Sequence, residues 1–346
     1  GKIPLYSVDI AYMLNNKTGL IKINKFSSTT YDEFYKSLKK LQKEGLKNLI
    51  IDLRGNGGGY LREAVFMADE FLAGEKLIVY TEGTHYKREN YTAGRPGDFE
   101  EGKLSILIDE NSASASEILS GALQDWDRAT IIGRRSFGKG LVQEQYNMAD
   151  NSALRLTVAK YYIPSGRSIQ KVYSNKDDYK KEVFDRYQHG EFYSQDSIHN
   201  NDSLIYFTKI KNRKVYGGGG ITPDIFVPFD TIQNNSYVNR LKIKVPEFVY
   251  NYYSDYSERF TPYNSVENFN ANFIVTEKLF DDFLTYAESK GWKKDFSKLS
   301  ENKENLKDFL KAYFAKQLFQ NEGYFRLAYK NDPVIKKALE EFNTNK

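Results

Sequence analysis

Leu49-Ile50-Ile51-Asp52-Leu53 is a short apolar run that passes directly into the loop Arg54-Gly55-Asn56-Gly57-Gly58-Gly59. About four to eight apolar residues bounded by a turn signal are typical of a strand that is buried on both faces. A helical pattern follows the loop and ends at Gly74, with its apolar positions at Ala64, Val65, Ala68, Phe71 and Leu72. The order of strand, glycine loop and helix predicts an α/β fold.

The same alternation extends over the first half of the chain. We predict further strands over residues 21–26, 104–108, 129–132 and 154–158. Further helices are predicted from apolar faces at Phe34, Leu38 and Leu41, and at Ile118, Leu119, Ala122 and Leu123. The segment Thr30-Tyr31-Asp32-Glu33 has the pattern of a capping box at the start of the first of these helices. The repeated order of strand and helix predicts a sheet with helices packed on it.

Two later regions differ from this core. Residues 165–220 are polar and rich in tyrosine, and we predict a long excursion with short elements that returns to the core near Ile225. Beyond residue 235 the pattern is helical, with apolar faces at Leu279, Phe280, Phe283, Leu284 and Ala287, and at Leu306, Phe309, Leu310, Tyr313, Phe314 and Leu318. We therefore predict a core over residues 1–232 and a small helical domain over residues 233–346.

The composition excludes several classes of function. The 346 residues carry a formal charge of only +4, which gives no reason to expect a nucleic-acid partner. The chain has no cysteine, so disulfides, thiolate metal sites and cysteine nucleophiles are excluded. The three histidines, His85, His189 and His199, lie in polar segments without ligand spacing, so we expect neither a metal, a cofactor nor a Ser-His-Asp triad. No run approaches the roughly 20 apolar residues of a membrane span.

Ser114 is the candidate nucleophile. It lies in the small-residue run 111–117, between a predicted strand and a predicted helix, where unpaired N-terminal amides of the helix are available. The Ala115 N–H can form half of an oxyanion hole. A second donor must come from elsewhere, and Gly57 or Gly58 is suited because glycine lets the backbone approach a ligand closely.

Lys139 is the candidate general base, 25 residues after Ser114. A lysine acts as a base only when it is neutral, and this requires burial, which lowers its pKa. Apolar Phe137 and Leu141 lie on either side of the glycines that flank Lys139. Gln143, four residues further on, can hydrogen-bond the amine and orient it. These residues together predict a serine-lysine dyad.

Two other interpretations stay open on the residues alone. Small serine-containing segments also cap helices, and a lysine in a glycine turn is commonly solvated. The alternative to an enzyme is therefore a non-catalytic module that binds peptides or other ligands. The segment 133–139 matches the first part of a P-loop, but Gly140 stands where that motif needs a serine or threonine for magnesium. A nucleotide-binding function therefore has weak support.

Several of these segments together resemble the carboxy-terminal processing (tail-specific) protease family. The segments that carry the resemblance are residues 48–59, 111–123, 133–140, 161–170 and 220–224, which occur in the family's order between about residues 5 and 230. Several motifs in series make the resemblance specific. It implies a crotonase-like (ClpP/crotonase-type) α/β protease core of a sheet with packed helices.

The resemblance also implies a function and a role for each site residue. The implied function is a serine endopeptidase that cleaves near the C-termini of extracytoplasmic proteins, bound as extended C-terminal segments. The implied roles are Ser114 as nucleophile, Lys139 as general base, Gln143 as the residue that orients the lysine, and Ala115 with Gly58 or Gly57 as the oxyanion hole. The implied location is the periplasm or cell envelope.

One feature of the family is absent from the sequence. Family members usually carry a PDZ domain before the segment that here begins Ile3-Pro4-Leu5, and we expect this chain to be a catalytic core without it. The helices beyond residue 235 match no part of the family residue by residue. We expect them to dock on the core, to mediate oligomerisation or to hold substrate.

Overall fold

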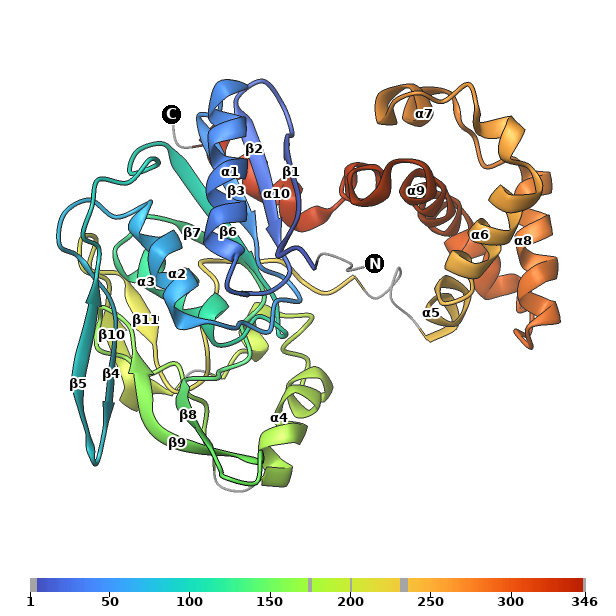
Figure 1. Cartoon of the computed structure of the whole chain (residues 1–346). Coiled ribbons are helices and arrows are strands. Elements are labelled where there is room, and N and C mark those ends of the chain that lie inside the picture. The colour runs from blue at the N-terminus through green and yellow to red at the C-terminus, as the bar shows by residue number, and fades with distance from the viewer. Residues whose placement is uncertain (1–4, 174–175, 200, 231–235, 345–346) are drawn as a thin grey trace. The chain divides into compact units, whose positions relative to one another are not determined.

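The computed structural model describes all residues except 1–4, 174–175, 200, 231–235 and 345–346. Ile3 and Pro4, which the resemblance places after an upstream domain, lie outside the described residues. The chain divides into two compact units, one of residues 1–228 with 334–346 and one of residues 229–333 (Figure 1). The predicted division assigned residues 334–346 to the helical domain, whereas their contacts place them in the first unit. Each unit is described by itself.

A six-stranded sheet forms the centre of the first unit. Its strands, in spatial order, are β1 (Val8–Met13), β2 (Thr18–Ile23), β3 (Asn48–Asp52), β6 (Lys103–Ile108), β7 (Thr130–Gly133) and β12 (Ile225–Phe226). β1 is antiparallel to β2, and the other neighbours are parallel. Parallel strands need crossover connections, and the helices that make them are α1 (Thr30–Lys43), α2 (Leu61–Asp69) and α3 (Ala115–Asp125). The predicted α/β core of a sheet with packed helices is confirmed.

The helices pack on the sheet through the apolar residues that the sequence indicates. Phe34, Leu38 and Leu41 of α1 are fully buried and share one core with the sheet strands. The predicted capping box at Thr30 is wrong, because Thr30 already lies inside α1 and the N-cap residue Thr29 makes no side-chain capping hydrogen bond. Glu33 instead accepts a hydrogen bond of 2.7 Å from the backbone N–H of Ser7 and so ties α1 to the start of β1.

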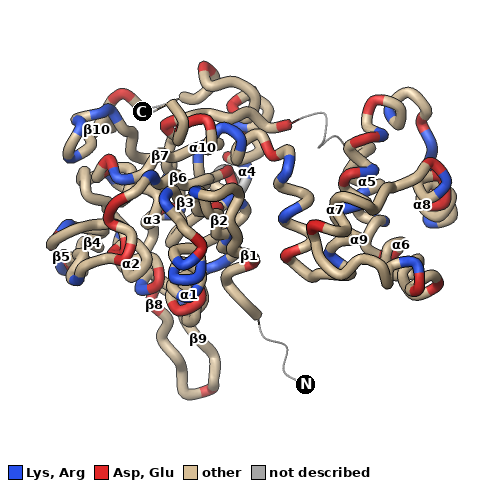
Figure 2. Tube along the Cα trace, turned by 90° about the horizontal axis from the view of Figure 1, so that it is seen from above, with Lys and Arg blue, Asp and Glu red and all other residues tan. Residues whose placement is uncertain are grey.

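A second, antiparallel sheet has the order β5 (Tyr86–Thr92), β4 (Leu77–Gly83), β9 (Ala153–Tyr162) and β8 (Leu141–Asn147). The hairpin of β8 and β9 projects from its unit in both views (Figures 1 and 2). Of this sheet, the sequence predicted only the first half of β9, residues 154–158. β5 and β8 were missed because their side chains are mostly polar and exposed, so neither strand presents an apolar run.

The predicted excursion contains a full helix, α4 (Lys176–Gln188), besides short elements. The short elements are two 3-10 turns, η1 (Gln195–Ser197) and η2 (Asp202–Leu204), and the hairpin of β10 (Ile205–Phe207) and β11 (Lys214–Tyr216). The chain then rejoins the central sheet through β12. The return near Ile225 agrees with the prediction, whereas α4 carries no regular apolar face that would have indicated a helix.

The second unit is helical and has a core rich in aromatic rings. Its predicted faces are buried, with Phe283, Leu306, Leu310 and Phe314 fully inaccessible to solvent. Its elements are α5 (Ser236–Lys242), α6 (Val245–Asp255), η3 (Ser257–Phe260), α7 (Val266–Asn272), α8 (Glu277–Ser289) and α9 (Phe296–Ala328). The final helix, α10 (Pro333–Thr344), packs with the first unit.

Candidate active site

Ser114 lies at the turn where the chain leaves β6 and enters α3. Its backbone has φ +57° and ψ −113°, a conformation that residues other than glycine rarely adopt. Such local strain persists only where surrounding contacts enforce it, and it gathers at functional sites. The Ala115 N–H, at the first position of α3, makes no hydrogen bond to any described residue. The turn therefore presents a hydroxyl next to an unpaired backbone donor.

The three serines of this segment have different surroundings. The buried Ser112 hydroxyl donates to the carbonyl of Leu53, and the buried Ser116 hydroxyl donates to the carbonyl of Asn56, each over 2.9 Å. The Ser114 side chain is only half-buried; its oxygen takes part in a capping box with the Glu117 backbone N–H, and its hydroxyl hydrogen is donated to no described residue. Ser112 and Ser116 thus fasten the segment to the glycine loop, while Ser114 is left available.

Gly58 is the glycine that the structure places against Ser114. Its φ is +92°, and a Cβ added there would lie 2.8 Å from the Ser114 Cβ and 2.9 Å from the Ala115 nitrogen. A Cβ added to Gly57 would meet nothing within 4 Å. The Gly58 N–H donates to Asn56 Oδ1 over 2.8 Å, so in this arrangement the Ala115 N–H is the free donor next to Ser114.

The fully buried carboxylate of Glu117 joins the Ser114 turn to the Lys139 loop. Its Oε2 accepts from the backbone N–H groups of Ser114 and Lys139, each over 2.8 Å, so the two nitrogens lie at most twice that distance apart. Its Oε1 accepts from the Gly138 N–H over 2.7 Å and from the Ser136 hydroxyl over 2.5 Å. Burial raises the pKa of Glu117, and these four hydrogen bonds oppose the rise.

Glu117 is the site residue that the sequence analysis missed. The signal was present, because Ser114-Ala115-Ser116-Glu117 has the S-x-x-E pattern in which a glutamate reaches back to the backbone N–H of the capping serine. The bond from the Ser114 N–H to Glu117 is that contact. The same pattern was assigned to Thr30 instead, where it does not form.

The side chains of Lys139 and Gln143 make no hydrogen bond to Ser114 among the bonds of the described residues. Both are exposed, and neither makes a hydrogen bond or ion pair with any residue that the structure describes. Gln143 lies on the edge strand β8, opposite Thr157 of β9. The structure thus brings Ser114, Ala115 and Gly58 together and holds the Lys139 backbone near them. The predicted roles of the Lys139 amine and the Gln143 amide remain predictions.

The excursion supports the Lys139 loop through buried charges. Arg186 of α4 donates to the Ser136 carbonyl over 3.0 Å and pairs with Glu191 over 2.9 Å. The Lys171 N–H donates to the Gly138 carbonyl over 3.0 Å. Burial lowers the pKa of both Arg186 and Lys171. Breaking one partner away from a buried ion pair leaves an uncompensated charge, which is costly. These contacts therefore fix the loop conformation.

A second charge cluster anchors the start of the glycine loop. The Asp52 carboxylate at the end of β3 is fully buried and pairs with Arg54 over 2.8 Å and with Lys22 over 3.4 Å. Burial alone would raise the pKa of Asp52, but Arg54 and Lys22 hold it well below its ordinary range. The Lys22 amine also donates to the Arg54 carbonyl. The cluster fixes the chain where it turns toward Gly58.

The geometry also bears on the other classes of site. The segment 133–139 leads into β8, so it lacks the helix N-terminus on which a P-loop binds phosphate. In the described part of the chain, no three His, Cys, Asp or Glu residues are grouped as metal ligands. Among the same residues, no helix is both long and apolar enough to cross a membrane.

Comparison with known proteins identifies the family of the region that carries this site. The model of peptidase family S41 matches residues 17–179. This region holds Ser114, Glu117 and the Lys139 loop. A second match, over residues 237–320, is to a family of unknown function (DUF8443) and lies in the helical unit.

Curated relatives of the S41 region are processing proteases. A carboxyl-terminal-processing protease of Picosynechococcus is 41% identical over 157 residues, which cover 45% of this chain and 37% of the relative. A carboxy-terminal-processing protease of Bartonella bacilliformis is 42% identical over 167 residues, which cover 46% of this chain and 38% of the relative. The chain thus spans less than two-fifths of the length of either relative.

Among solved structures, the photosystem II D1 C-terminal processing protease is similar to part of the chain. The similarity has a TM-score of 0.44 and 30% identity, and it covers 51% of this chain and 49% of that protein. The family match and the curated relatives confirm the resemblance to carboxy-terminal processing proteases that the sequence indicates.

Proposed function

We propose that the chain is a serine endopeptidase that cleaves near the C-termini of extracytoplasmic polypeptides. Ser114 attacks the scissile carbonyl, and Lys139, oriented by Gln143, takes the proton from the hydroxyl. The Ala115 N–H and the Gly58 N–H stabilise the oxyanion once the Gly58 N–H is released from Asn56. Lys139 passes the proton to the leaving amine as the peptide C–N bond breaks, and water then hydrolyses the acyl-enzyme, as in other reactions with a covalent serine intermediate.

The observation that carries this proposal is the state of the Ser114 hydroxyl. Ser114 has a strained backbone, a half-buried hydroxyl that donates to no described residue and an unpaired N–H next to it, whereas the neighbouring serine hydroxyls donate to backbone carbonyls. A purely structural cap has no need of a strained backbone at the capping serine. The match of residues 17–179 to a peptidase family supports the same assignment.

The exposed Lys139 side chain favours one alternative, a module that binds peptides without cleaving them. A neutral lysine requires burial, and Lys139 is exposed in this conformation. In the proposed enzyme, substrate binding buries Lys139 against Ser114 and so assembles the dyad. A binding module would hold the same peptide with Lys139 still charged. The two functions differ in whether Ser114 becomes acylated.

A proteolysis assay tests the proposal. The purified chain is incubated with an unfolded protein whose C-terminal fragments are identified by mass spectrometry, beside the variants Ser114→Ala and Lys139→Ala. We expect fragments released from near the C-terminus by the wild type and by neither variant. Undiminished cleavage by Lys139→Ala would overturn the mechanism, and binding of the unfolded protein without any cleavage would favour the binding module.

A further inference from the structure

A cavity of about 470 Å³ lies in the helical unit, where α5 ends, α6 begins and the loop after α8 passes. Its size falls in the range of sites that hold small ligands or a few residues of a peptide. The family that matches this unit has no known function, so no ligand is assigned to the cavity. Its lining combines aromatic rings with an excess of positive charge.

The apolar part of the lining is built around Trp292. The Trp292 side chain is 7% exposed, and its ring centre lies 5.3 Å from that of Tyr237. Ile243 adds an aliphatic side chain that is 72% exposed. The buried Trp292 Nε1–H has no hydrogen-bond partner among the described residues, whereas the Tyr237 hydroxyl bonds the backbone of Asp295. This side of the lining is therefore aromatic and aliphatic.

The charged part of the lining consists of four cations. Lys290 pairs with Glu247 over 2.9 Å. The other three, Arg240, Lys244 and Lys293, make no ion pair with any described residue. Several cations around one small cavity raise the local potential and attract an anion. The lining therefore fits a negatively charged group that carries an apolar body.

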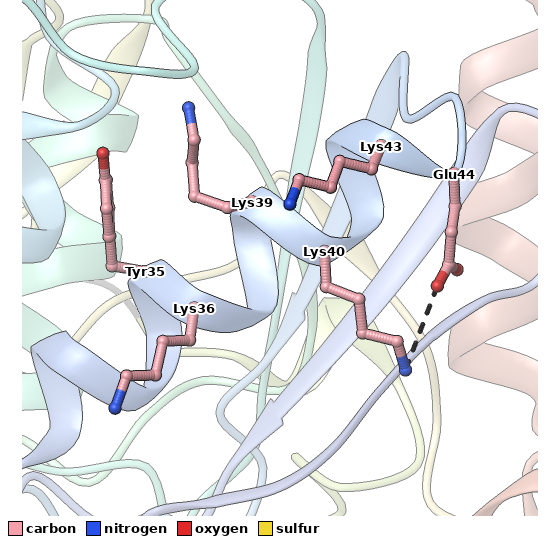
Figure 3. Close-up of a pocket in the computed structure, with 6 residues that line it drawn as sticks. All are labelled: Tyr35, Lys36, Lys39, Lys40, Lys43 and Glu44. Carbon is pink, nitrogen blue, oxygen red and sulfur yellow. Dashed lines mark ion pairs between the residues drawn. The ribbon is translucent and has the colours of Figure 1, made fainter.

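A second lysine-rich hollow shows what the aromatic lining adds. The hollow along α1, of about 420 Å³, carries Lys36, Lys39, Lys40 and Lys43 (Figure 3). Lys39 pairs with Asp98, Lys40 reaches Glu44 over 4.0 Å, and the one aromatic that lines it is only half-buried. All of its lining residues come from one helix and the residue after it. That hollow is the solvated face of a helix and serves as a control.

We propose that the cavity beside Trp292 binds a carboxylate attached to an apolar side chain, as at the C-terminal residue of a polypeptide. The α-carboxylate lies among Arg240, Lys244 and Lys293, and the terminal side chain lies against Trp292 and Ile243. The choice of a polypeptide end rests on the proposed function, because a protease that acts near C-termini meets such ends on its substrates. The site is separate from Ser114 and needs no reaction there.

A binding assay on the full chain tests this site. The Ser114→Ala variant is titrated into a fluorescein-labelled hexapeptide that ends in leucine, with either a free carboxylate or a C-terminal amide, and anisotropy is recorded. Because charge-assisted hydrogen bonds contribute about 1.5–3 kcal/mol, we expect the amide to bind at least about tenfold more weakly. The double substitution Arg240→Gln with Lys293→Gln should weaken binding of the free acid by a similar factor. Both side chains are exposed, so the variant is expected to fold.

The control variant is Lys36→Gln with Lys43→Gln, which removes the same charge from the α1 hollow. We expect it to bind the free acid within about twofold of the parent. Equal affinity for the acid and the amide would overturn the proposal, as would unchanged binding by the cavity variant. Displacement of the peptide by inorganic phosphate at the concentration of the peptide would show that the site binds anions in general. That result would also overturn the proposal.

The assay separates this proposal from that for the protease. Binding is measured on a chain whose nucleophile has been removed, so it does not depend on catalysis. A wild-type chain that cleaves while the Ser114→Ala variant binds acid and amide equally would refute the carboxylate site alone. A chain that binds the acid selectively but does not acylate at Ser114 would refute the protease alone.

Discussion

Replacing Glu117 by glutamine tests how the Ser114 turn and the Lys139 loop are held together. The substitution keeps the size of the side chain but turns one carboxylate oxygen into an NH2 group, which cannot accept a hydrogen bond. Each oxygen of Glu117 accepts two hydrogen bonds, so two buried donors lose their acceptor. At about 1–3 kcal/mol for each unsatisfied group, we expect the free energy of unfolding to fall by about 2–6 kcal/mol.

The substitution should also lower the activity of the molecules that remain folded. Glu117 is the one carboxylate that both backbone segments of the site share, so its replacement lets the Lys139 loop move relative to Ser114. The two measurements are urea unfolding and the rate of proteolysis below the unfolding transition. We expect proteolysis to fall by at least about a hundredfold, because a displacement near 1 Å of a catalytic group costs that much.

Leu38→Ala is the control for stability alone. Leu38 is fully buried in α1, outside both segments of the site, and a leucine-to-alanine change in a core costs about 2–5 kcal/mol. We expect this variant to lose as much stability as Glu117→Gln and to keep its activity. A Glu117→Gln variant with wild-type activity, or with a stability change below about 0.5 kcal/mol, would refute the role assigned to the carboxylate.

Three further predictions concern the surroundings of Ser114. Ser112→Ala should lower the free energy of unfolding by about 1–3 kcal/mol, because the Ser112 hydroxyl hydrogen-bonds buried backbone groups. Ser114→Ala should instead abolish proteolysis at unchanged stability. Urea unfolding and activity assays compare the two variants. Gly58→Ala should lower the activity and should lower the free energy of unfolding by about 1–3 kcal/mol through backbone strain, while Gly57→Ala should be tolerated. Equal effects of the two substitutions in the same assays would contradict the assignment of Gly58. The pKa of Asp52 is depressed in the folded state, so its carboxylate stabilises the fold above the unfolded pKa of about 3.8, and this stabilisation is lost on acidification. Asp52→Asn should therefore lower the free energy of unfolding at pH 7 by about 3–5 kcal/mol and make that free energy depend less on pH in the acid range.

Features that depend on local pattern could be predicted from the sequence. The β3 strand and its glycine loop follow from one apolar run and its neighbouring glycines. The buried faces of α1 and α8 follow from helical spacing. The turn at Ser114 follows from small residues between two such elements. In each of these cases the residues that determine the structure are adjacent in the chain.

Features that depend on distant contacts could not be predicted. α4 has no apolar face, and its Arg186 bonds carbonyl groups about 50 residues away in the chain, at Arg135 and Ser136. α10 belongs to the first unit, where the Lys103 amine bonds the Phe342 carbonyl, a contact across most of the sequence. The exposed position of the Lys139 side chain also depends on how the loop is fastened, which its neighbours in sequence do not determine.

The most direct test of the account is the site of covalent labelling by a fluorophosphonate, read by intact mass and peptide mapping. If Ser114 is the nucleophile and Lys139 its base, the wild-type chain gains a single adduct on Ser114 and Lys139→Ala labels at least about a hundredfold more slowly, the range of a lost general base. An adduct on Ser112 or Ser116, no adduct at all, or labelling of Lys139→Ala at the wild-type rate would contradict the account.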